Sequence, residues 1–148
     1  MCWFKKKVIP IPVEPETIEP RSTARINLAE LQPLLQKAAP GAEIIMADNW
    51  KYLCHDDDIA LFLAQDETNK MGYVVDKRDC DDFSYRLMGQ FSIPKWSDLA
   101  FGICWTDVHA LNVFIDEVRR LWFIEPQTDE INEELATWQG QVVSLIVM

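Results

Sequence analysis

The sequence predicts a single α+β domain, with helices in the first part of the chain and strands in the last third. A chain of 148 residues is of ordinary size for one domain with its own core. Leucines recur at helical spacing in residues 28–38, whereas residues 99–147 contain short apolar runs broken by turn residues. We therefore expect helices packed on an antiparallel β-sheet.

The N-terminal residues 1–25 are set apart by their prolines. Pro10, Pro12, Pro15 and Pro20 fall within eleven positions, and so many fixed φ angles favour an extended segment. We expect residues 1–25 to form a proline-rich arm and residues 26–148 to form the folded domain.

Three helices are expected before residue 92. Asn27 can cap a helix over residues 28–38, which Pro40 and Gly41 end. Three aspartates at 56–58 precede an apolar run, and acidic residues are favourable at a helix N-terminus. The stretch from Asp79 has helical spacing as far as Met88, with Gly89 or a neighbour as its end.

Four strands are expected over residues 99–105, 109–115, 121–124 and 142–147. The link between the second and third is short enough for a hairpin, because only residues 116–120 join them. In an antiparallel pair the start of one strand lies beside the end of the next. His109 and Glu125 are therefore predicted at the same edge of the sheet.

The net charge and the two ends of the sequence indicate which partners the protein can bind and where in the cell it is found. A formal net charge of -10 argues against nucleic-acid binding, which needs clustered Lys and Arg on the phosphates. The basic run at residues 5–7 lacks the apolar stretch of a signal peptide, and the apolar residues 142–148 are too few for a spanning helix. These features predict a cytoplasmic or virion-associated protein with no transmembrane segment.

Cys80, His109 and Glu125 form the candidate catalytic constellation. A cysteine at a helix N-terminus meets the positive end of the helix dipole, and a nearby histidine can take its proton. A carboxylate on the paired strand can accept a proton from the imidazole and hold its orientation. The alternatives are a small core cysteine, a structural histidine and a solvated glutamate at a strand end, with Asn112 as a turn or supporting amide.

The motifs at these positions resemble a known family. The strings Asp79-Cys80-Asp81-Asp82-Phe83, His109-Ala110-Leu111-Asn112 and Glu125-Pro126-Gln127 are similar to the papain-like protease domain at the C-terminus of fungal chimeric agglutinins. The same order of parts is also similar to bacterial transglutaminase-like cysteine proteinases. The resemblance implies a papain-like fold, in which a nucleophile-bearing helix packs on an antiparallel sheet.

The same resemblance implies roles for individual residues. It implies Cys80 as nucleophile, His109 as base and Glu125 as the residue that orients the imidazole. It also implies a calcium ion held by oxygens of Asp81, Asp82 and Gln127, and oxygen ligands suit this hard cation.

Two functions follow from these observations. The first is a cysteine hydrolase, a protease or amidase, that cleaves peptide or amide bonds in a peptide or protein substrate through an acyl-enzyme on Cys80. The alternative is a non-catalytic papain-like module, on a phage or virion, that uses the same cleft for binding or assembly.

Overall fold

The computed structural model describes residues 19–22, 24–133, 135 and 141–148. Most of residues 1–25 lie outside the described residues, so the division into an arm and a domain stays a prediction. No helix in the described part of the chain is long and apolar enough to cross a membrane.

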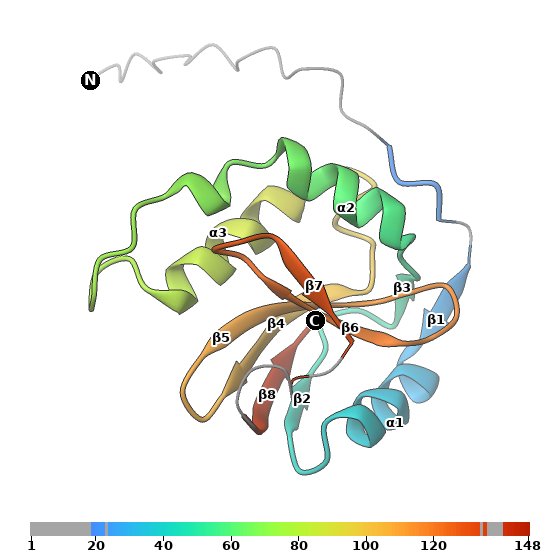
Figure 1. Cartoon of the computed structure of the whole chain (residues 1–148). Coiled ribbons are helices and arrows are strands. Elements are labelled where there is room, and N and C mark those ends of the chain that lie inside the picture. Colours follow the sequence, from blue (N-terminus) through green and yellow to red (C-terminus); the bar gives the residue numbers. More distant parts are fainter. Residues whose placement is uncertain (1–18, 23, 134, 136–140) are drawn as a thin grey trace, which may run out of the picture.

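A six-stranded sheet forms the centre of the molecule, in the order β2-β8-β4-β5-β6-β7 (Figure 1). Its strands are β2 (Glu43–Ile45), β4 (Phe101–Thr106), β5 (Ala110–Ile115), β6 (Leu121–Glu125), β7 (Glu130–Asn132) and β8 (Val143–Val147). All neighbours are antiparallel except β2 and β8, which are parallel. Strands β1 (Arg25–Asn27) and β3 (Trp50–Tyr52) form a separate antiparallel pair.

Helices cover both faces of this sheet. Helix α1 (Leu28–Ala38) lies on one face, and α2 (Asp56–Gln65) and α3 (Cys80–Phe91) lie on the other (Figure 1). A 3₁₀ helix, η1 (Thr68–Lys70), follows α2. The alternation of side chains along the strands gives two buried clusters, one on each face.

Local sequence explains the best-defined elements. Helix α1 begins at a capping box, in which the Glu30 N–H donates to Asn27 Oδ1 over 3.0 Å and the Glu30 carboxylate accepts from the Asn27 N–H. Gly102 permits the close approach of β4 and β8, because a Cβ at this position would lie 2.2 Å from the Val147 carbonyl oxygen. The sheet therefore depends on a glycine at that position.

The α+β class is confirmed, and several finer predictions are corrected. The sheet is mixed and not purely antiparallel, because β2 pairs in parallel with β8. Helix α3 ends at Phe91, close to the predicted end at Gly89 or a neighbour, and the apolar residues of its last turns are buried against the sheet. No sequence pattern predicted β1, β3 and β7, which have only three residues each.

Candidate functional site

The candidate site lies where the first turns of α3 meet the ends of three strands. The rings of Tyr85 on α3 and Trp105 on β4 have their centroids 5.9 Å apart. Asn112 on β5 donates from Nδ2 to the Ser84 carbonyl of α3 over 3.1 Å. Helix α3 is thus packed against the hairpin formed by β4 and β5.

His109 and Glu125 form the most tightly defined pair of the site. His109 Nε2 and Glu125 Oε2 are 2.6 Å apart, and both side chains are mostly buried, at 19% and 13% exposure. The second carboxylate oxygen of Glu125 accepts from the Gln127 N–H over 3.1 Å. The predicted meeting of the two strand ends is confirmed, and the imidazole is held in one orientation.

The backbone at His109 is fixed by the turn between β4 and β5. The Thr106 N–H donates to the His109 carbonyl over 2.8 Å, and the His109 N–H donates to Thr106 Oγ1 over 2.9 Å. These bonds close the turn and position the histidine at the start of β5.

Cys80 is the first residue of α3, as the sequence predicted, and its side chain is half-buried. Ser84 Oγ donates to the Cys80 carbonyl over 3.0 Å, which is a bond within the helix. Among the described residues, no hydrogen bond joins the Cys80 thiol to the His109 imidazole. The structure pairs the histidine with Glu125 and does not pair it with the cysteine.

Asn112 links the helical layer to the sheet. It is fully buried, and besides its bond to α3 it donates to the Gly102 carbonyl over 3.2 Å. Its Oδ1 has no hydrogen-bond partner among the described residues. Of the roles that the sequence left open, the structure favours the supporting amide, because Asn112 holds α3 against β5.

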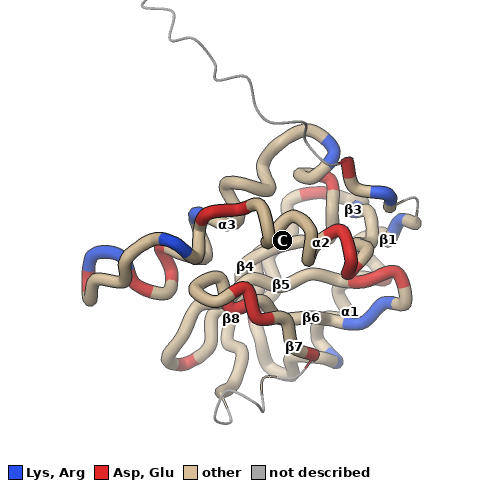
Figure 2. The backbone as a smooth tube through the Cα atoms, turned by 45° about the horizontal axis from the view of Figure 1, so that its top comes forward, with Lys and Arg blue, Asp and Glu red and all other residues tan. Residues whose placement is uncertain are grey.

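Three aspartates gather at the start of α3, where Figure 2 shows a run of acidic residues beside basic ones in the preceding turn. Carboxylate oxygens of Asp79, Asp81 and Asp82 lie within 4.8 Å of one another. A hydrogen bond with Asp81 raises the pKa of Asp79, and burial and the neighbouring negative charges add to the effect. The predicted calcium ligands are Asp81, Asp82 and Gln127, so Asp79 was not among them. Calcium binding by these three residues stays a prediction.

Neither the exposure of Tyr85 nor its contact with Trp105 was predicted from the sequence. Tyr85 of α3 is 54% exposed, and Val108, in the turn that leads to His109, is 71% exposed. The signal for Tyr85 was present, because it lies on the face of α3 opposite the buried Phe83 and Leu87. Its contact with Trp105 depends on tertiary packing, which no local pattern reports.

The comparisons with known proteins give structural matches. No family model matches the chain, and no curated protein matches it. The chain is similar to a solved structure described as "PSL1a-E64 complex", with a TM-score of 0.73 and 16% identity over 84% of this chain and 50% of the other. It is also similar to Polyporus squamosus lectin bound to Neu5Aca2-6Galb1-4GlcNAc, with a TM-score of 0.70 and 18% identity over 84% of this chain and 49% of the other.

These matches establish a shared fold. The chain spans about half the length of the lectin chains that it matches. At this level of identity, likeness does not transfer activity or ligand from one protein to the other.

The matches also correct the sequence-based assignment. A structure that shares the fold is described as Polyporus squamosus lectin, so the expectation of a papain-like cysteine protease is withdrawn, together with that of a peptide or amide hydrolase acting on a peptide substrate. The motifs around Cys80, His109 and Glu125 correctly predicted the contact of His109 with Glu125, but no hydrogen bond among the described residues joins Cys80 to that pair. These motifs were too short to identify the function of the chain.

Proposed function

We propose that this chain is a non-catalytic binding module that recognises neutral carbohydrate on the surface formed by Tyr85, Trp105, His109 and Glu125. The observation that carries the proposal is that an aromatic pair, Tyr85 and Trp105, and an oriented polar pair, His109 and Glu125, lie at the same end of the sheet. The likeness to a lectin supports the same class of ligand.

The chemistry of a sugar fits both parts of this surface. A sugar ring offers an apolar C–H face, which packs on an aromatic ring, and hydroxyl groups, which both donate and accept hydrogen bonds. Tyr85 is exposed and its ring is tilted by 58° to that of Trp105, so the pair presents two differently inclined faces. His109 and Glu125 supply a preorganised imidazole and carboxylate for the hydroxyls.

The charge of the surface favours a neutral ligand over an anionic one. Asp79, Asp81 and Asp82 form an acidic cluster at the start of the same helix, and the chain has a net charge of -10. A sugar carboxylate on this surface would meet like charges, which act against binding. The sialylated glycan of the Polyporus squamosus lectin is therefore not carried over to this surface.

The other predicted site residues have supporting roles in this proposal. Cys80 forms part of the surface at the start of α3, and Asn112 holds that helix in place. Calcium bound by Asp81, Asp82 and Gln127 stays a proposal. It would reduce the repulsion described above, so added calcium is expected to improve the binding of a sialylated glycan more than that of a neutral one.

A matched pair of tyrosine variants tests the proposal. Tyr85→Ala removes the exposed ring of the site, and Tyr73→Ala removes a ring of nearly equal exposure, 53% against 54%, in the loop between η1 and α3. On an array of neutral and sialylated glycans, the wild-type chain and Tyr73→Ala are expected to bind the same neutral sugars. Tyr85→Ala is expected to lose them by about tenfold or more, which corresponds to about 1.4 kcal/mol.

Two results would contradict the proposal. Equal losses in the two variants would place the sugar away from Tyr85. The absence of binding to any neutral glycan by the wild-type chain would overturn the proposed ligand class.

A further inference from the structure

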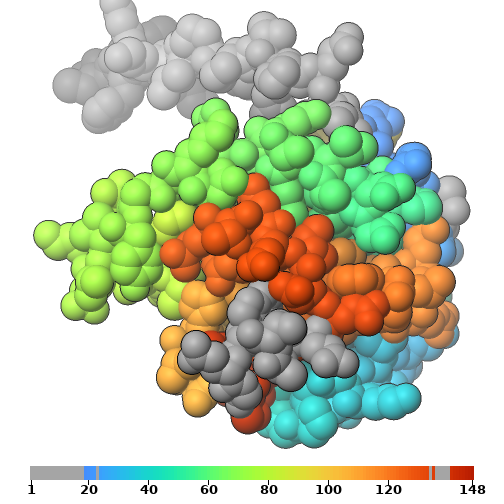
Figure 3. Space-filling model, in the orientation of Figure 1, coloured from blue at the N-terminus to red at the C-terminus, as the bar shows by residue number. Residues whose placement is uncertain are grey.

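A second cluster of polar groups lies where the turn between β6 and β7 meets the segment that follows α2. Figure 3 shows these two segments against each other on the surface of the molecule. Asn69 of η1 donates from Nδ2 to Asp129 Oδ2 over 2.5 Å, across 60 residues of sequence. The contact joins the helical layer to the edge of the sheet.

Three oxygens in this cluster are buried without a hydrogen-bond partner among the described residues. They are Thr68 Oγ1, Asn69 Oδ1 and Asp129 Oδ1. Thr68 is completely buried, so water does not reach its hydroxyl from the surface. Buried polar atoms are rarely left unpaired, and three in adjoining residues indicate a missing ligand.

The cluster has an excess of negative charge. Asp66 Oδ2 accepts from the Thr68 N–H over 2.8 Å, so the Asp66 carboxylate is held next to this cluster. Burial raises the pKa of Asp129, and the charge of Asp66 raises it further. The nearby Lys70 pairs with Glu67 over 3.0 Å, and no ion pair of the described residues neutralises Asp66 or Asp129.

We propose that Thr68, Asn69 and Asp129 form a binding site for a divalent cation, Ca²⁺, that bridges η1 and the β6–β7 turn. The free groups are a hydroxyl, an amide carbonyl and a carboxylate, which are the oxygen ligands that calcium accepts in its irregular coordination shells. The positive charge would satisfy all three oxygens and offset the two carboxylates. The bound ion would also hold the turn that follows Glu125.

This site differs from the aspartates at the start of α3, and it does not depend on the carbohydrate proposal. It has ligands from two segments far apart in sequence, and the binding energy therefore stabilises their packing. Calcium is expected to raise the temperature of thermal unfolding of the full chain.

Calcium titration of four proteins tests the proposal. They are the wild-type chain, Asp129→Asn, Thr68→Val, and a double variant Asp81→Asn with Asp82→Asn that removes the other acidic cluster. Affinity is measured by isothermal titration with CaCl₂ and by the rise in melting temperature relative to EDTA. The wild-type chain and the double variant are expected to keep a calcium-dependent rise, whereas Asp129→Asn is expected to lose affinity by about tenfold or more.

Thr68→Val keeps the proposal testable if Asp129→Asn fails to fold. In EDTA this variant is expected to melt at or above the wild-type temperature, because the hydroxyl that it removes has no partner. With calcium its rise in melting temperature is expected to be smaller. The absence of any calcium-dependent rise in the wild-type chain, or its loss only in the Asp81 and Asp82 double variant, would overturn the proposal.

Discussion

Replacing Asp116 with alanine tests how the hairpin between β5 and β6 is held. Only 5% of its side chain is exposed. Its Oδ1 accepts from the Val118 and Arg120 N–H groups over 3.0 and 2.8 Å, and its Oδ2 accepts from Trp122 Nε1 over 2.8 Å. The guanidinium of Arg120 adds a fourth bond over 2.8 Å.

The expected loss follows from these bonds. The Arg120 side chain is half exposed, so its contribution is screened by solvent and is set aside. The remaining three bonds are worth about 1 kcal/mol each, which gives a loss of about 3 kcal/mol in the free energy of unfolding for Asp116→Ala. The bonds matter for the site because this hairpin pairs the strands that carry His109 and Glu125.

Urea unfolding of the purified chain measures this loss. Asp107→Ala is the matched control, because Asp107 is an exposed aspartate in the neighbouring turn between β4 and β5. The control is expected to change stability by less than about 0.5 kcal/mol. A loss of less than about 1 kcal/mol for Asp116→Ala, or one equal to the control, would refute the reasoning from hydrogen bonds.

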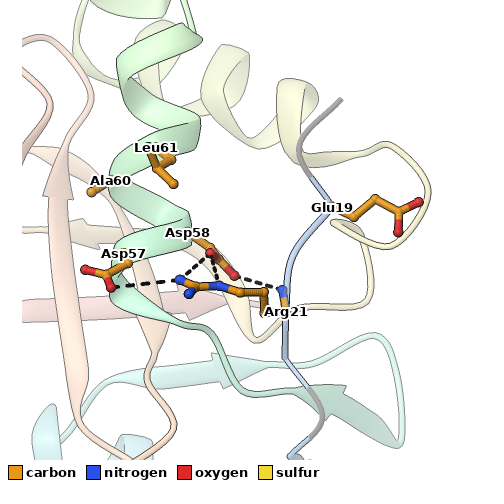
Figure 4. A pocket seen from close by; sticks show the side chains of 6 residues that line it. All are labelled: Glu19, Arg21, Asp57, Asp58, Ala60 and Leu61. Carbon is orange, nitrogen blue, oxygen red and sulfur yellow. Dashed lines mark hydrogen bonds and ion pairs between the residues drawn. The ribbon is translucent and has the colours of Figure 1, made fainter. Parts of the chain in front are cut away.

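Three further predictions follow from buried groups. Burial opposes the ionisation of Asp58, but hydrogen bonds and charge from Arg21 outweigh it and lower the pKa of Asp58, as the pairing in Figure 4 illustrates. The contribution of Asp58 to stability is therefore complete above the unfolded pKa of about 3.9 and is lost as the pH falls below it. Asp58→Asn is expected to flatten acid unfolding curves between about pH 5 and 2, and an unchanged acid midpoint would contradict this. Asn112→Asp places a carboxylate against the buried Ser84 and Gly102 carbonyls, so calorimetry is expected to show a larger fall in melting temperature at pH 7 than at pH 5. Equal falls in melting temperature at both pH values would contradict a buried carboxylate at this position. Burial raises the pKa of the Cys54 thiol well above its usual range, with a smaller effect of the Asp116 charge, and burial raises the pKa of the Cys104 thiol to about 12. Neither thiol is therefore expected to react with iodoacetamide until the chain is unfolded. Modification of either cysteine in the native chain, detected by peptide mass spectrometry, would contradict this.

Local sequence patterns predicted those parts of the fold that local interactions stabilise. Asn27 and Glu30 are three residues apart and cap α1 by themselves, so the start of that helix could be derived before the structure was known. The pairing of His109 with Glu125 could be derived from one short hairpin.

Interactions between distant segments could not be derived in this way. The parallel pairing of Glu43–Ile45 with the C-terminal strand joins residues about a hundred positions apart, and neither segment carries a signal for the other. The same holds for the contact of Tyr85 with Trp105 and for that of Asn69 with Asp129. The proposed functional surface and the proposed calcium site both depend on such contacts.

The family assignment from sequence was wrong for a related reason. Short strings around Cys80, His109 and Glu125 specify a helix start and two strand ends, and the structure has all three. Ligand identity depends instead on the shape and charge of the surface around them, which includes Tyr85 and the aspartates of α3.

The most direct test of the carbohydrate proposal is a titration followed by two-dimensional ¹H–¹⁵N NMR. The ¹⁵N-labelled chain would be titrated with the neutral disaccharide Galb1-4GlcNAc and separately with Neu5Aca2-6Galb1-4GlcNAc, the glycan bound by the Polyporus squamosus lectin. We expect saturable shifts for the neutral sugar that cluster at the Tyr85, Trp105 and His109 amides, and weaker shifts at those amides for the sialylated glycan. Saturable shifts centred elsewhere, or stronger binding of the sialylated glycan at these residues in the absence of calcium, would contradict it.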